Sequence, residues 1–193
     1  MRLVALLLCA VAVAADTDPE PNPFEKGWDR PVDPDKDCKF VREKAGLTIT
    51  VPGKDHDLGV ERGRMNSPRL LRDVEGDFVV QLRVGGDFTP SNAATTDERV
   101  PFVGAGLLLM ADDKTYVRLE RAALRRDAGV KTYANWELRR DGKWEKAGET
   151  ALLPLVAKAT HLRLERKGEK ILASVSEDGK KWDVPWAKPF RFD

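Results

Sequence analysis

Two stretches decide the fold: Phe102-Val-Gly-Ala-Gly-Leu-Leu-Leu-Met-Ala111 and, after a short polar interval, Tyr116-Val-Arg-Leu-Glu-Arg121. In the second stretch, Val117 and Leu119 alternate with polar residues, which places the two sets on opposite faces of a β-strand. The first stretch is apolar on both faces, so its outer side must also be covered. Together they predict a β-hairpin.

The same period of two recurs along the chain. It is seen in 47–51, 78–84, 135–139 and 161–166. Asp141-Gly142 and Asp178-Gly179 separate alternating segments, and Asp-Gly favours the positive backbone angles of a tight hairpin turn. Turn signals every 8–12 residues or so are typical of a sandwich or barrel. No segment shows convincing helical periodicity, so the sequence predicts an all-β fold.

Two long connections are candidates for covering the apolar strand. They run from Pro52 to Pro68 and from Gly85 to Pro101, and both lack a strand pattern. Irregular loops of this length within a compact domain are usually functional or disordered. We expect them to roof part of the sheet.

Composition limits the class of protein. The chain has 193 residues, a length that suits one folded domain. Its 33 basic and 32 acidic side chains form no basic block, which argues against a nucleic-acid partner. With 41% hydrophobic and 34% charged residues, it is neither disordered by composition nor a membrane bundle.

The N-terminus has the pattern of a signal peptide. Arg2 precedes an apolar run from Leu3 to Val13 that is too short to span a bilayer, followed by small residues suited to cleavage after Ala14 or Ala15. We therefore predict a signal peptide at 1–15, a proline-rich arm at 16–31 and one domain at 32–193, exported to a periplasm or secreted. Cys38 is then the one cysteine of the mature chain, and packing is favoured over a reactive thiol.

Four segments resemble a known family when taken together. The first is residues 68–78, which end in Gly-Asp-Phe. The other three are Gly104-Ala-Gly-Leu-Leu-Leu, Tyr116-Val-Arg-Leu-Glu-Arg and Ser176-Glu-Asp-Gly-Lys-Lys-Trp. They are similar to the regulation-of-enolase-like family of the concanavalin A-like lectin/glucanase superfamily. The resemblance covers residues 28–184 and implies a jelly-roll sandwich of two antiparallel sheets, whose curved face binds sugars in related families. It implies no established activity.

Catalytic motifs are not found. A laminarinase-type site needs Glu-x-Asp-x-x-Glu, but Glu75-Gly-Asp77 is followed by Val80 where the second glutamate should stand. The nucleophile elbow, the zinc-protease motif and the phosphate-binding loop do not occur either, and we predict no cofactor.

Metal sites are not favoured. Asp33-Pro-Asp-Lys-Asp37 has alternating carboxylates, and a solvated turn is favoured there over a calcium site outside the EF-hand pattern. With only two histidines, a histidine-based zinc site is not expected. His56 and Asp57 lie in the first long loop, either held by neighbouring groups or binding a ligand at the rim of the sheet.

The polar faces of two strands form the main candidate binding surface. If they are neighbours, they gather Tyr116, Arg118 and Glu120 with Asn135, Glu137 and Arg139. One interpretation is a cross-strand ion ladder worth about 0.2–1 kcal/mol per pair. The other is a groove walled by the two long loops, where Arg118 and Glu120 bind sugar hydroxyls and Tyr116 stacks on the ring.

Three functions follow as hypotheses. The leading one is an exported, non-catalytic carbohydrate-binding domain with a glycan as partner. The second is a glycan-active enzyme with a carboxylate pair assembled across strands, Glu120 with Glu137. The third is a structural envelope protein without a small ligand.

Overall fold

The computed structural model describes residues 3–7, 28, 30–43, 46–95, 99–145 and 152–189. In these ranges the regular structure is β-strand, apart from a single 3₁₀ turn, η1 (Val60–Arg62). The all-β prediction is confirmed.

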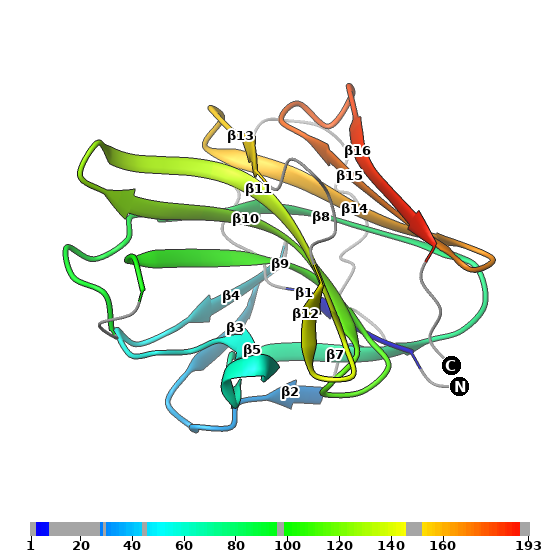
Figure 1. Cartoon of the computed structure of the whole chain (residues 1–193), viewed down its shortest axis with the longest axis horizontal. Helices are drawn as coiled ribbons and strands as arrows, with labels where there is room; N and C mark the ends of the chain where they lie inside the picture. Colours follow the sequence, from blue (N-terminus) through cyan, green and yellow to red (C-terminus); the bar gives the residue numbers. More distant parts are fainter. Residues whose placement is uncertain are drawn as a thin grey trace.

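Two antiparallel sheets make up most of the structure (Figure 1). The larger has the order β12 (Lys143–Glu145), β11 (Gly129–Arg140), β10 (Tyr116–Arg126), β9 (Phe102–Met110), β1 (Leu3–Leu7), β7 (Arg69–Val74) and β2 (Arg30–Val32), with β13 (Leu152–Pro154) also paired to β11. The smaller has the order β16 (Asp183–Pro189), β15 (Lys170–Ser176), β14 (Ala159–Lys167) and β8 (Phe78–Gly85). Two separate hairpins complete the structure, β3 (Lys39–Glu43) with β4 (Gly46–Thr50) and β5 (Leu58–Gly59) with β6 (Arg64–Met65).

The main hydrophobic core lies between the two sheets. Alternate residues of β9, β10 and β11 face alternate residues of β8, β14 and β15, and the buried set includes Leu109, Leu119, Trp136, Leu162 and Ile171. This two-layer packing is that of a β-sandwich. The jelly-roll connectivity implied by the family resemblance stays a prediction.

Turn chemistry explains the predicted hairpin tips. Asp141 and Gly142 join β11 to β12 with φ of 51° and 76°, and Gly179 lies between β15 and β16 with φ of 72°. The left-handed region admits glycine freely and aspartate with little strain, as Asp-Gly predicts.

Both faces of β9 are covered along its second half. Leu107 and Leu109 enter the main core, while Leu108 and Met110 form a second cluster with Leu58 and other residues of the β5–β6 region. The covering segment lies within the connection from Pro52 to Pro68, which is less irregular than predicted because it contains β5, η1 and β6. On the first half of β9, the outer face is left open.

The predicted N-terminal segments are described only in part. Of residues 1–15, Leu3–Leu7 forms strand β1, which pairs with β7 on one side and β9 on the other. Of residues 16–31, only 28, 30 and 31 are described, and the rest of the proline-rich arm lies outside the described residues. Removal of the predicted signal peptide would therefore take β1 out of the larger sheet.

Among the described residues, no helix combines the length and the apolar character needed to cross a membrane.

Candidate functional site

Strands β10 and β11 bring the predicted polar residues together. The pairing register sets Tyr116 opposite Arg139, Arg118 opposite Glu137, and Glu120 opposite Asn135. Because side chains alternate between faces, all of these project from the face opposite the main core. The expected gathering of polar side chains on one surface is confirmed.

Arg118 is the centre of this cluster. Its guanidinium lies 2.5 Å from Glu137, 3.4 Å from Asp57 and 3.8 Å from Glu120, and its side chain is only 13% exposed. Burial acts to lower the pKa of Arg118, but the three carboxylates outweigh it and raise that pKa. Asp57 comes from the loop before β5, so the guanidinium ties the first long connection to the sheet.

Arg139 extends the same network. It forms ion pairs with Glu137 and, at 3.1 Å, with Glu61 of η1. Its guanidinium also lies over the ring of Tyr116, 5.7 Å from the ring centre. These contacts hold η1 against the end of β11.

The two glutamates of the cluster have opposite electrostatic environments. Burial acts to raise the pKa of Glu137, but Arg118 and Arg139 outweigh it, so this pKa is lowered. Burial raises the pKa of Glu120, and the charge of Glu137 adds to the effect despite Arg118. The Asn135 amide donates hydrogen bonds to both, 3.2 Å to Glu120 and 2.8 Å to Glu137. Glu120 is thus the carboxyl that takes up a proton first.

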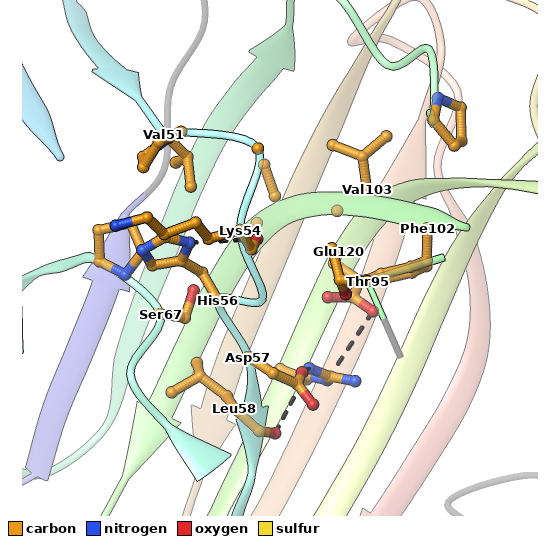
Figure 2. A pocket seen from close by; sticks show the side chains of 18 of the residues that line it. Val51, Lys54, His56, Asp57, Leu58, Ser67, Thr95, Phe102, Val103 and Glu120 are labelled. Atoms are coloured by element: carbon orange, nitrogen blue, oxygen red, sulfur yellow. Dashed lines mark hydrogen bonds and ion pairs between the residues drawn. The ribbon is translucent and has the colours of Figure 1, made fainter. Parts of the chain in front are cut away.

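A pocket of about 440 Å³ opens beside this cluster (Figure 2). Its floor is the first half of β9, and its walls come from both long connections. Its lining includes Lys54, His56, Asp57, Thr89, Ser91, Thr95, Phe102, Gly104, Arg118 and Glu120. Both long loops therefore border the part of the predicted surface that carries Arg118 and Glu120.

An aromatic ring and a carboxylate meet over a glycine on the pocket floor. A Cβ at Gly104 would lie 2.8 Å from the Phe102 ring and 3.2 Å from a Glu120 oxygen. The absence of a side chain there leaves room for both groups. Phe102 is 40% exposed, and Figure 2 shows it close to Glu120 and Thr95 at one side of the pocket.

Tyr116 does not take the predicted stacking role. Its ring is fully buried, and its hydroxyl donates to the Leu58 carbonyl at 2.9 Å and accepts from the Val60 amide at 3.3 Å. The β5–β6 hairpin covers the end of the sheet where Tyr116 lies, so the ring has no open face. The structure makes Tyr116 a packing residue and corrects that expectation.

His56 and Asp57 are both held by neighbouring groups, and both line the pocket. Arg99 of the second long connection lies 2.5 Å from Asp57, in addition to Arg118. Burial acts to raise the pKa of Asp57, but these two guanidiniums outweigh it and lower that pKa. The His56 side chain is 3% exposed, with Nε2 2.9 Å from an Asp37 carboxylate oxygen.

Cys38 lies beside the same carboxylate. Burial, followed by the charge of Asp33, raises the pKa of its thiol to about 12, which keeps the thiol protonated at neutral pH. That agrees with the interpretation that Cys38 is not a reactive nucleophile.

Of the other predicted residues, Asn135 and Glu137 belong to the ion network but do not line the pocket. Sequence reasoning missed Phe102 and Arg99. A signal for Phe102 exists, since Phe102-x-Gly104-x-Gly106 places an aromatic ring and two bare backbone positions on one face of a strand. Nothing local marks Arg99, which reaches Asp57 only through the folding of two loops.

Comparison of the chain with models of protein families, with curated proteins and with solved structures yields no match.

Proposed function

We propose that the chain is an exported, non-catalytic carbohydrate-binding domain of the concanavalin A-like type, which holds a glycan in the pocket over β9. The observation that carries the proposal is the exposed Phe102 ring beside the Glu120 carboxylate, above the bare backbone of Gly104. An aromatic face next to a hydrogen-bond acceptor matches a sugar ring, which has an apolar face and a rim of hydroxyls.

The surrounding polar groups support a neutral, hydroxyl-rich ligand. Asp57 and Glu120 are held by the same guanidinium, and the hydroxyl-bearing side chains of Thr89, Ser91 and Thr95 also line the pocket. Because the carboxylates are already fixed by Arg118, little conformational entropy is lost when a ligand binds them. The guanidiniums of Arg99, Arg118 and Arg139 also offset most of the charge of the cluster's four carboxylates, so no strongly charged ligand is needed.

A glycan-active enzyme is the second candidate. It is favoured by the opposite pKa shifts of Glu120 and Glu137, because a raised and a lowered carboxyl are the usual acid and base of glycoside hydrolysis. Of this pair, however, Glu120 lines the pocket and Glu137 does not. A scissile bond in the pocket would therefore reach one carboxyl of the pair, and binding without cleavage is the better-supported function.

A glycan array followed by calorimetric titration tests the proposal. Phe102→Ala and Glu120→Gln should each weaken binding by about tenfold or more, which corresponds to about 1.4 kcal/mol. Trp144→Ala and Glu165→Gln are matched controls, because Trp144 is an exposed aromatic away from the pocket and Glu165 lies on the other sheet. Equal losses in the controls, or no binding to any glycan, would refute the proposal.

Product analysis of the same mixtures separates binding from catalysis. Release of sugar that is lost in both Glu120→Gln and Glu137→Gln would establish the enzyme instead. Silence in both assays would leave the structural envelope role.

Export is part of the proposal and has its own test. The sequence supports it through the apolar run from Leu3 to Val13 and the small residues suited to cleavage after Ala14 or Ala15. Intact-mass measurement of protein recovered from the periplasm or medium should show a chain that begins at residue 15 or 16. A full-length chain that retains Leu3–Leu7 in the sheet would refute cleavage.

A further inference from the structure

A cluster of potential metal ligands lies beside the ion network. Cys38 Sγ, His56 Nε2 and an Asp37 carboxylate oxygen all lie within 4.8 Å of one another. Asp37 and Cys38 end the loop between β2 and β3, whereas His56 belongs to the loop between β4 and β5. The site is therefore assembled by the fold.

The first loop is shaped so that its two ligands converge. The Asp33 carboxylate accepts hydrogen bonds from the backbone amides of Lys36, at 3.1 Å, and Cys38, at 2.9 Å. Lys36 takes a positive φ of 56°, which turns the chain sharply before Asp37. Lys54 Nζ forms an ion pair with Asp37 Oδ2 at 3.0 Å, and the other carboxylate oxygen, Oδ1, faces the Cys38 thiol and the His56 imidazole.

The orientation of His56 provides a second, independent observation. Its Nδ1 lies 3.3 Å from the Lys54 carbonyl oxygen, which can hold a ring proton on Nδ1 and so free Nε2 for a metal. Nε2 points at the carboxylates that would share that metal, 2.9 Å from Asp37 Oδ1 and 3.7 Å from Asp35. A second ring nitrogen that donates to a carbonyl is the usual support of a metal-binding histidine.

Three potential ligand atoms therefore converge on one point, and the His56 side chain among them is almost fully buried. Without a metal, the Cys38 thiol donates to Asp37 Oδ1, and His56 Nε2 lies within hydrogen-bond distance of the same oxygen. A single divalent cation at the same point would replace both contacts.

We infer that Asp37, Cys38 and His56 form a zinc-binding site. A thiolate, an imidazole and a carboxylate are the ligands that Zn²⁺ takes in proteins, whereas Ca²⁺ takes six to eight oxygens. Ligand atoms around tetrahedral zinc lie about 3.5 Å apart, so the pair formed by His56 Nε2 and Asp37 Oδ1 at 2.9 Å must open slightly, and a pair as wide as 4.8 Å must contract. The thiol proton passes to solvent on binding, the imidazole binds through Nε2 with its proton on Nδ1, and water or Asp35 takes the fourth position.

The site would also stabilise one wall of the pocket. Lys54 and His56 line the pocket and belong to the loop that carries Asp57. Zinc would join this loop to the one ending at Cys38. The inference does not depend on the nature of the pocket's ligand.

Cobalt spectroscopy on tag-free protein tests the site. Co²⁺ should bind one per chain, with a near-ultraviolet thiolate charge-transfer band and visible bands of a tetrahedral ion, and Zn²⁺ should displace it. Cys38→Ser and His56→Gln should each weaken Zn²⁺ binding by about 10–100-fold or more. His161→Gln alters the chain's other histidine, and this variant should bind Zn²⁺ as the unaltered protein does.

Two results would overturn the inference. One is the absence of the thiolate band in the unaltered protein, which is decisive even if a variant fails to fold. The other is cation binding, by Zn²⁺ or Ca²⁺, that survives both Cys38→Ser and His56→Gln in variants that melt as the unaltered protein does. That result would assign the cation to the acidic loop alone.

Discussion

Replacement of Arg118 by methionine should destabilise the protein strongly. The substitution keeps an unbranched, flexible chain in place, so a cavity contributes little, but it removes the cation shared by Asp57, Glu120 and Glu137. Breaking a buried ion pair by removing one partner costs about 3–5 kcal/mol. For a domain of this size, each kcal/mol lowers Tm by about 2–4 °C, so Tm should fall by about 6–20 °C.

Urea unfolding and thermal melting at pH 7 measure this effect. Arg140→Met is the matched control, because Arg140 and Glu145 form an exposed pair at 3.8 Å, where about 0–1 kcal/mol is expected. Adding Glu137→Gln to Arg118→Met should recover part of the loss, since one uncompensated charge is removed. A loss below about 1 kcal/mol would refute the reasoning and show that the cluster is a solvent-screened ion ladder.

Three further predictions concern single residues. Because the folded-state pKa of Glu137 is lowered, this residue stabilises the fold above the unfolded-state pKa of about 4.3, and that stability is lost as the pH falls below it. Glu137→Gln should therefore flatten the acid side of a profile of unfolding free energy against pH, measured with urea. The folded-state pKa of Glu120 is raised, so the sign is opposite, and Glu120→Gln should gain stability relative to the unaltered protein as the pH rises above about 4.3. Gly106→Ala should lower the free energy of unfolding by more than about 4 kcal/mol or abolish folding, since its Cβ would lie 2.0 Å from a backbone oxygen of the neighbouring strand. Gly53→Ala is the control: with open space around it, this substitution should change the free energy of unfolding by less than about 0.5 kcal/mol. Tyr116→Phe should cost about 1–3 kcal/mol in urea unfolding, because the Val60 amide loses the hydroxyl and the Leu58 carbonyl keeps only the 3.4 Å contact with Arg118. An unchanged midpoint would show that the hydrogen bonds of the Tyr116 hydroxyl do not form.

Local patterns were sufficient to predict several central strands, whereas the pairing of β10 with β11 was only a condition of the predicted polar surface. The alternation in Tyr116–Arg121 and Asn135–Arg139 depends only on the two-residue repeat of a strand, and the Asp141-Gly142 turn is a local feature. The two alternating segments lie in β10 and β11, and the Asp141-Gly142 turn follows β11. The gathering of Arg118, Glu120 and Glu137 follows from that pairing.

What covers a strand face could not be predicted from the strand itself. Periodicity shows that Tyr116 and Glu120 share a face, but the β5–β6 hairpin covers only the end that carries Tyr116. The residue placed at the open end is Phe102, which lies on the neighbouring strand β9. The aromatic residue at the pocket was therefore assigned to the wrong strand.

Contacts between distant loops were also beyond sequence reasoning. Arg99 reaches Asp57 across 42 positions, and His56 reaches Asp37 across 19. Counting histidines, which argued against a histidine-based zinc site, takes no account of a thiol and a carboxylate that another loop brings to the same point. Loop conformation depends on tertiary packing, for which single-sequence patterns hold no information.

The central claim is that a glycan binds over the first half of β9. Backbone amide chemical shifts of labelled protein, measured with and without an oligosaccharide selected on the array, test it most directly. We predict that the largest changes occur at Phe102, Gly104, Gly106 and Glu120, with smaller changes in the loop that carries Asp57. Changes confined to the outer face of β14 and β15, or none at saturating oligosaccharide, would contradict the account.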